Sequence, residues 1–143
     1  MITGLQHFHS GLAYLVLLGL LLSVILFLFR RTQASFTAMD KRLALTTLIL
    51  THLQLLLGLI LYFIGPKGFA YFQEANVMTN ELMRLYAIEH ITVNILGIAL
   101  ITIGYSRAKR IAQPRRKYGT LALFYGLGLL LILSRIPWDM WLA

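Results

Sequence analysis

The chain alternates between long apolar runs and shorter polar segments. The apolar runs cover about residues 10–29, 43–64, 82–105 and 118–136. Each run has about the 20 mostly apolar residues that a helix needs to cross the hydrocarbon core of a bilayer. Backbone groups surrounded by lipid must form hydrogen bonds within their own segment, so we expect helices. The pattern predicts an all-α fold: a single-domain integral membrane four-helix bundle with up-down topology.

Composition supports a membrane protein. Apolar residues make up 59% of the 143-residue chain and charged residues only 13%. A soluble domain averages roughly 25% charged residues, so the lipid bilayer is the expected solvent. The net charge of +8 would suit nucleic acid, but a chain this apolar would not remain in water to meet it, and no nucleic-acid partner is expected. The lack of cysteine excludes disulfides and thiolate metal sites.

Ten of the thirteen basic residues lie in the two segments that follow the first and third runs. They are Arg30, Arg31, Lys41, Arg42, Arg107, Lys109, Arg110, Arg115, Arg116 and Lys117. The positive-inside rule places both segments in the cytoplasm and both termini outside. The first run should stay in place rather than act as a cleaved signal peptide, because its basic residues follow it instead of preceding it.

Polar residues within the predicted spans are the candidate site residues, because a bilayer makes them costly. On the third run, His90, Asn94 and Gly97 share one helical face with Ile101 and Gly104. This small, polar face should point into the bundle. It would serve either tight packing on a neighbouring helix or the close approach of a ligand.

The second run carries a similar stripe, which consists of Thr47, Thr51, Gln54, Gly58 and Tyr62. His52 lies about 160° from Gln54 at 100° per residue, so the two cannot share a narrow face. We expect His52 to be buried against a metal, a cofactor or a hydrogen-bond partner rather than exposed to lipid.

Three histidines suggest bis-histidine ligation of haem b. His52 and His90 lie within predicted spans, and His9 is expected just before the first helix. Two axial pairs are open: His52 with His90, or His9 with His90. At 1.5 Å per residue, His90 lies roughly 12 Å and His52 roughly 18 Å below the outer ends of their helices, which counts against the first pair. The second pair would place the cofactor near the outer surface.

The outer helix ends carry charged residues that suit two roles. Arg84 and Arg135 are candidates to pair with haem propionates. Glu89 is expected to form a structural ion pair with one of these arginines. No phosphate-binding loop, dinucleotide fingerprint or serine–histidine–acid arrangement is evident, so catalysis is left open.

The sequence resembles small bacterial four-helix membrane proteins labelled cytochrome b or cytochrome-b-like. The matching pieces are HSG at 9–11, THLQLLLGLILYF at 51–63, EH at 89–90, IGYSR at 103–107 and RIPW at 135–138. The resemblance spans nearly the whole chain. It implies haem binding or electron transfer, possible ligands among His9, His52 and His90, and a location in the bacterial cytoplasmic (inner) membrane.

Other functions remain open at this point. The glycine-lined helix faces also suit a non-catalytic subunit or assembly factor of a larger membrane complex. Size and helix count are similar to the small membrane-embedded protoporphyrinogen oxidases, although no clear motif matches them. A quinol- or quinone-binding protein is a further alternative, either as an electron-transfer partner or as a site of its own.

Overall fold

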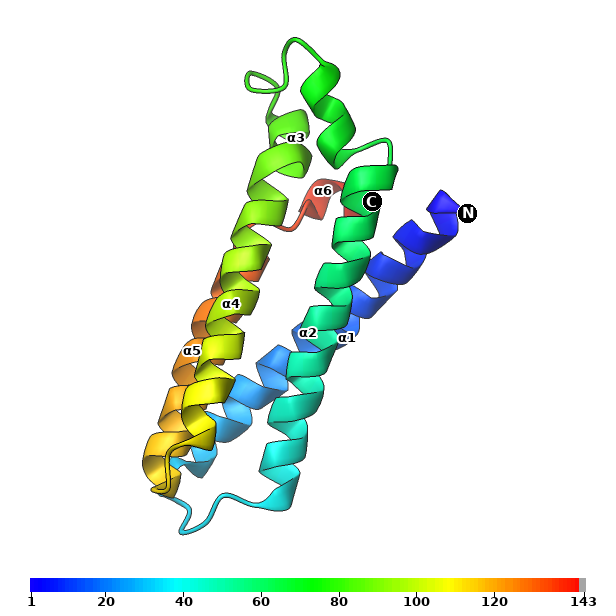
Figure 1. Cartoon of the computed structure of the whole chain (residues 1–143). Coiled ribbons are helices and arrows are strands. Elements are labelled where there is room, and N and C mark those ends of the chain that lie inside the picture. The colour runs from blue at the N-terminus through cyan, green and yellow to red at the C-terminus, as the bar shows by residue number, and fades with distance from the viewer. Residues whose placement is uncertain (142–143) are drawn as a thin grey trace.

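A computed structural model describes residues 1–141, and this part of the chain has an all-α fold (Figure 1). The long helices are α1 (Ile2–Phe29), α2 (Ala38–Ile64), α4 (His90–Lys109) and α5 (Pro114–Ser134). Together with their flanking turns, they form four segments that are long and apolar enough to cross a membrane. The predicted all-α class and the four helices of spanning length are therefore confirmed.

Successive long helices run in opposite directions along the bundle (Figure 1). The connections α1–α2 and α4–α5 lie at one end, which we call the basic end because the ten basic residues named above flank these connections. Both chain ends lie toward the opposite end, which we call the termini end. The short helices α3 (Glu81–Arg84) and α6 (Trp138–Trp141) are also found there.

Several helix boundaries differ from the predicted ones. The helix α1 begins at Ile2 rather than near residue 10, so the prediction that His9 precedes the first helix was wrong. The helix continues through polar residues there, where the apolar run does not mark it. The helix α2 begins at Ala38 because Thr37 and Asp40 form a capping box. The helix α5 begins at Pro114, a residue favoured at the first helical position.

The apolar core lies between α1, α4 and α5. Its buried residues recur every three or four positions, as one face of each helix requires. The α4–α5 contact is especially close: a Cβ at Gly97 would lie 3.1 Å from the backbone oxygen of Gly128. Of the two roles open for Gly97, the structure shows helix packing, and Gly97 does not line the cavity described below.

Side-chain hydrogen bonds hold α2 at the basic end. Tyr118 donates to Asp40 Oδ2 at 2.6 Å, and Arg30 pairs with the other oxygen of Asp40 at 2.6 Å. Tyr125 donates to the backbone oxygen of Ala44 at 2.7 Å. These bonds fix the first half of α2 against α1 and α5. Toward the termini end the helices enclose a cavity instead.

Candidate functional site

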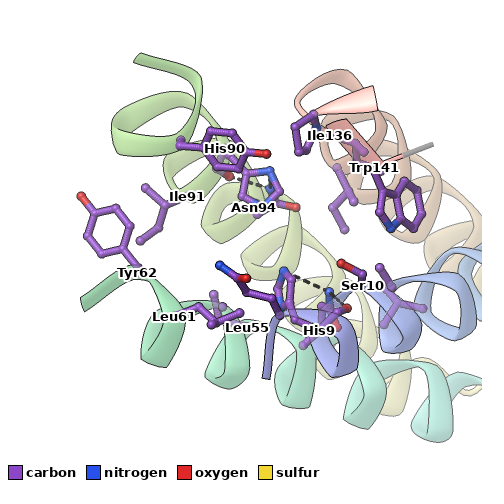
Figure 2. Close-up of a pocket in the computed structure, with 18 of the residues that line it drawn as sticks. His9, Ser10, Leu55, Leu61, Tyr62, His90, Ile91, Asn94, Ile136 and Trp141 are labelled. Atoms are coloured by element: carbon purple, nitrogen blue, oxygen red, sulfur yellow. Dashed lines mark hydrogen bonds between the residues drawn. The ribbon is translucent and has the colours of Figure 1, made fainter. Parts of the chain in front are cut away.

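The cavity has a volume of about 650 Å³ and lies between the four long helices at the termini end. Most of its lining is apolar, and includes Leu55, Leu59, Ile91 and Ile132. Apolar pockets of about 300–1,000 Å³ with a few placed polar groups are typical of small-molecule and cofactor sites. The polar side chains at this cavity, several of which Figure 2 labels, therefore determine which ligand it suits.

His90, the first residue of α4, lines one side of the cavity (Figure 2). Its Nδ1 lies 2.7 Å from the backbone oxygen of Arg135. Because a carbonyl oxygen only accepts, Nδ1 carries the proton and Nε2 holds a lone pair. Metal-ligating histidines almost always donate their other ring N–H in this way, which fixes the tautomer and the ring orientation. His90 is thus prepared to bind a metal through Nε2.

The backbone around His90 is held by neighbouring side chains. Asn94, one turn further along α4, lines the cavity and donates to the backbone oxygen of His90 at 2.5 Å. A π-helical turn, Leu85–Glu89, directly precedes His90. Tyr62 of α2 donates to the backbone oxygen of Ala87 within this turn at 2.8 Å. Such π-turns are frequent at functional sites, and here the turn sets where His90 starts the next helix.

His9 of α1 lines the opposite side of the same cavity (Figure 2). Its ring lies against Gly58 of α2, where an added Cβ would be 3.1 Å from His9 Cε1. Gln54 donates to the backbone oxygen of His9 at 2.9 Å, and its amide nitrogen lies 3.3 Å from His9 Nε2. This contact occupies Nε2, but Nδ1 of His9 is buried without a hydrogen-bond partner, as is Oε1 of Gln54.

A buried polar atom without a partner costs about 1–3 kcal/mol. Two such atoms, His9 Nδ1 and Gln54 Oε1, occur side by side on residues that line the cavity. The imidazoles of His9 and His90 therefore line one largely apolar cavity from different helices. A ligand with a metal centre or with hydrogen-bonding groups would satisfy these atoms.

His52 lies away from this cavity. Its side chain is exposed on the outside of the bundle, so the expectation of a buried histidine was wrong. Nδ1 lies 2.8 Å from the backbone oxygen of Leu48 in its own helix, and Nε2 lies 3.4 Å from Thr102 Oγ1 of α4. These contacts satisfy the ring without a cofactor. The angular separation of His52 from Gln54 correctly placed the two side chains on different faces of α2.

Arg84 and Arg135 do not line the cavity, because both side chains pair with Glu89. The distances are 2.7 Å from Arg84 Nε and 3.2 Å from Arg135 Nε to the two oxygens of Glu89. The expected ion pair of Glu89 is confirmed, and it involves both arginines at once. Their suggested role as propionate partners does not fit this arrangement.

Two residues that the sequence did not single out as site residues also line the cavity. Lys67 follows the end of α2 and places its Nζ 4.7 Å from the ring centroid of Tyr86. Trp141 lines the cavity and stacks on Tyr14 with ring centroids 4.5 Å apart. The only feature of the sequence that could have indicated these two residues is their position just beyond the ends of two apolar runs.

No family model, curated protein or solved structure matches this chain. The resemblance to cytochrome-b-like proteins therefore stays a prediction. The chemistry of the site follows from the side chains around the cavity.

Proposed function

We propose that this chain is a membrane-embedded haem b protein of the cytochrome b type that takes part in electron transfer. His9 and His90 are the residues that would hold the haem iron. The observation that carries the proposal is their placement: two imidazoles from different helices line one apolar cavity, and each has a ring nitrogen that no other side chain occupies.

The residues present fit the cofactor. The imidazoles of His9 and His90 are the side chains that would hold the haem iron, and His90 would do so through the lone pair on Nε2. The apolar lining would exclude water from the macrocycle and so influence its reduction potential. Bound haem would supply one-electron chemistry, while the chain's residues hold and orient it.

We further propose that the bundle lies in the bacterial inner membrane with its basic end in the cytoplasm. Ten basic residues cluster around two connections at one end of the bundle, as the positive-inside rule expects of a cytoplasmic face. The cavity then lies in the outer half of the membrane. Electrons would be exchanged with a quinol in the lipid or with a membrane protein partner on that side.

The test is an absorption spectrum of the purified protein from cells with adequate haem supply. We expect a Soret band, near-stoichiometric haem b and reversible reduction by dithionite. A well-folded protein without a Soret band, after both expression and titration with haem, would contradict the proposal.

A second candidate is a quinol site in the same cavity, and the buried Gln54 Oε1 favours it. A quinol hydroxyl would donate to this oxygen, whereas haem with ionised propionates has no donor to offer. In this case, a protein without a Soret band would bind a short-chain quinol, and Gln54→Leu would weaken the binding. Tight haem binding that quinol does not displace would count against the second candidate.

A further inference from the structure

Lys67 holds a distinctive position at the cavity. Gly65 and Pro66 end α2, and Gly68 turns the chain with a φ of +81°, a conformation that favours glycine. Lys67 lies between these residues. Its side chain is half-buried and lines the cavity, with the ammonium group over the ring of Tyr86.

The positive charge of Lys67 has no carboxylate partner in the described part of the chain. The ion pairs found within residues 1–141 join Arg30 to Asp40, and Glu89 to both Arg84 and Arg135. The cation–π contact with Tyr86 offsets part of the cost of desolvating the ammonium group. Burying a charge without a counter-charge remains unfavourable, so this position suits an anionic group in the cavity.

Among the arginines and lysines of the described chain, Lys67 alone lines the cavity. Arg84, which precedes His90, and Arg135, which follows α5, are both paired with Glu89. A ligand with an apolar body and an anionic end would therefore place that end at Lys67. The cavity wall and the cation together define a carboxylate-bearing hydrophobic ligand.

We propose that Lys67 binds a carboxylate of the cavity ligand, and, given the haem function proposed above, that this carboxylate is a haem propionate. The Lys67 ammonium would donate to the propionate, and Tyr86 would hold the ammonium at the mouth of the cavity. Lys67 thus sets the orientation of the cofactor and favours haem over porphyrins without a free carboxylate.

The experiment is a thermodynamic cycle that uses two probes, haem b and its dimethyl ester, in which both propionates are blocked. The haem-free protein in detergent is titrated with each probe, as wild type and as Lys67→Gln. We expect Lys67→Gln to bind haem about tenfold to hundredfold more weakly than wild type, as the loss of a charged hydrogen bond implies. The ester should bind both proteins equally, with the affinity of haem for Lys67→Gln.

Lys117→Gln is a matched control. Lys117 is also half-buried and lies over an aromatic ring, with Nζ 5.1 Å from the centroid of Phe36, but it does not line the cavity. It should bind haem as wild type does. Lys67→Arg, which keeps the charge, should retain most of the affinity, and this variant keeps the test valid if Lys67→Gln folds poorly.

The outcomes separate the two proposals. Equal affinity of haem for wild type and for folded Lys67→Gln, or equal affinity of wild type for haem and its ester, would overturn the role of Lys67 while leaving haem binding intact. Failure of both probes to bind the wild-type protein would overturn the haem function and, with it, the carboxylate assignment.

Discussion

Gln54 of α2 contacts both the backbone and the imidazole of His9 in α1. Its amide nitrogen lies 2.9 Å from the His9 backbone oxygen and 3.3 Å from His9 Nε2. The contact leaves Nδ1 as the ring nitrogen of His9 without a hydrogen-bond partner. A polar side chain within one predicted span thus orients a histidine near the start of another, although 45 residues separate them.

The first prediction concerns this contact. Gln54→Ala should weaken haem binding by about tenfold to hundredfold, which is the usual effect of removing the partner that orients a metal ligand. Titration of the haem-free protein measures it. Gln33→Ala changes an exposed glutamine at the basic end and serves as the control. Equal affinities for the two variants would show that Gln54 does not orient His9.

Gly58 should separate binding from stability. Alanine at this position adds a Cβ about 3.1 Å from His9 Cε1, so the imidazole must shift. Alanine is also the better helix former, by about 1 kcal/mol. Gly58→Ala should therefore weaken haem binding while the unfolding temperature of the haem-free protein stays equal or rises.

Gly4→Ala is the control for this substitution, because nothing lies within 4 Å of the added Cβ. It should leave haem affinity unchanged. If Gly58→Ala and Gly4→Ala bind haem equally well, the close approach of His9 to Gly58 has no role in the site.

The buried Asp40 at the basic end is expected to govern stability rather than haem binding. Tyr118→Phe removes the hydroxyl that donates to Asp40 Oδ2 at 2.6 Å. We expect the free energy of unfolding to fall by about 1–3 kcal/mol, since a buried carboxylate loses one of the donors to Oδ2 while the two from Thr37 remain. Denaturation followed by circular dichroism in detergent measures it, with the half-exposed Tyr105→Phe as the control. A loss of haem affinity without a loss of stability would contradict this assignment.

Arg84 should matter little for the cofactor, because its side chain pairs with Glu89 outside the cavity. Arg84→Gln is expected to keep haem affinity within about twofold of wild type and to cost about 1 kcal/mol of stability or less, as is usual for a partly exposed ion pair. The same titration used for Lys67→Gln measures it. A loss of affinity as large as that of Lys67→Gln would show that Arg84 does hold the propionates.

The membrane orientation has a direct test, because the chain contains no cysteine. Glu74→Cys and Gln33→Cys introduce single thiols at exposed positions of the termini end and the basic end. With the basic end in the cytoplasm, a membrane-impermeant thiol reagent should label only Glu74→Cys in spheroplasts with an intact inner membrane. Labelling of Gln33→Cys alone would invert the orientation.

Much of the fold could be predicted because the long helices coincide with apolar runs of membrane-spanning length. Apolar length predicted the four long helices, and the 100° step per residue placed Gln54, Gly58 and Tyr62 on the inner face of α2. The same step placed His52 on another face. His52 was expected to be buried, but its side chain is exposed. Helical periodicity determines which side chains lie together on a face, and the predicted faces of α2 depended mainly on this periodicity.

The remaining features of the site depend on contacts between segments. The polar start of α1 hid the fact that His9 is helical, because apolar runs mark only the part of a helix that needs lipid. The two contacts of Glu89 removed Arg84 and Arg135 from the cavity, and the turn at Gly68 brought Lys67 to it. Such pairings follow from the path of the chain between helices, which periodicity does not determine.

Ligation of haem by His9 and His90 is tested most directly by electron paramagnetic resonance, which reports the spin state of ferric haem in the purified protein and in single-histidine variants. Two axial imidazoles predict a low-spin signal in wild type. His9→Ala and His90→Ala should each lose it or convert it to high spin, whereas His52→Ala should keep it. A low-spin signal that survives in His9→Ala or His90→Ala but disappears in His52→Ala would contradict the assignment of the cavity as the haem site.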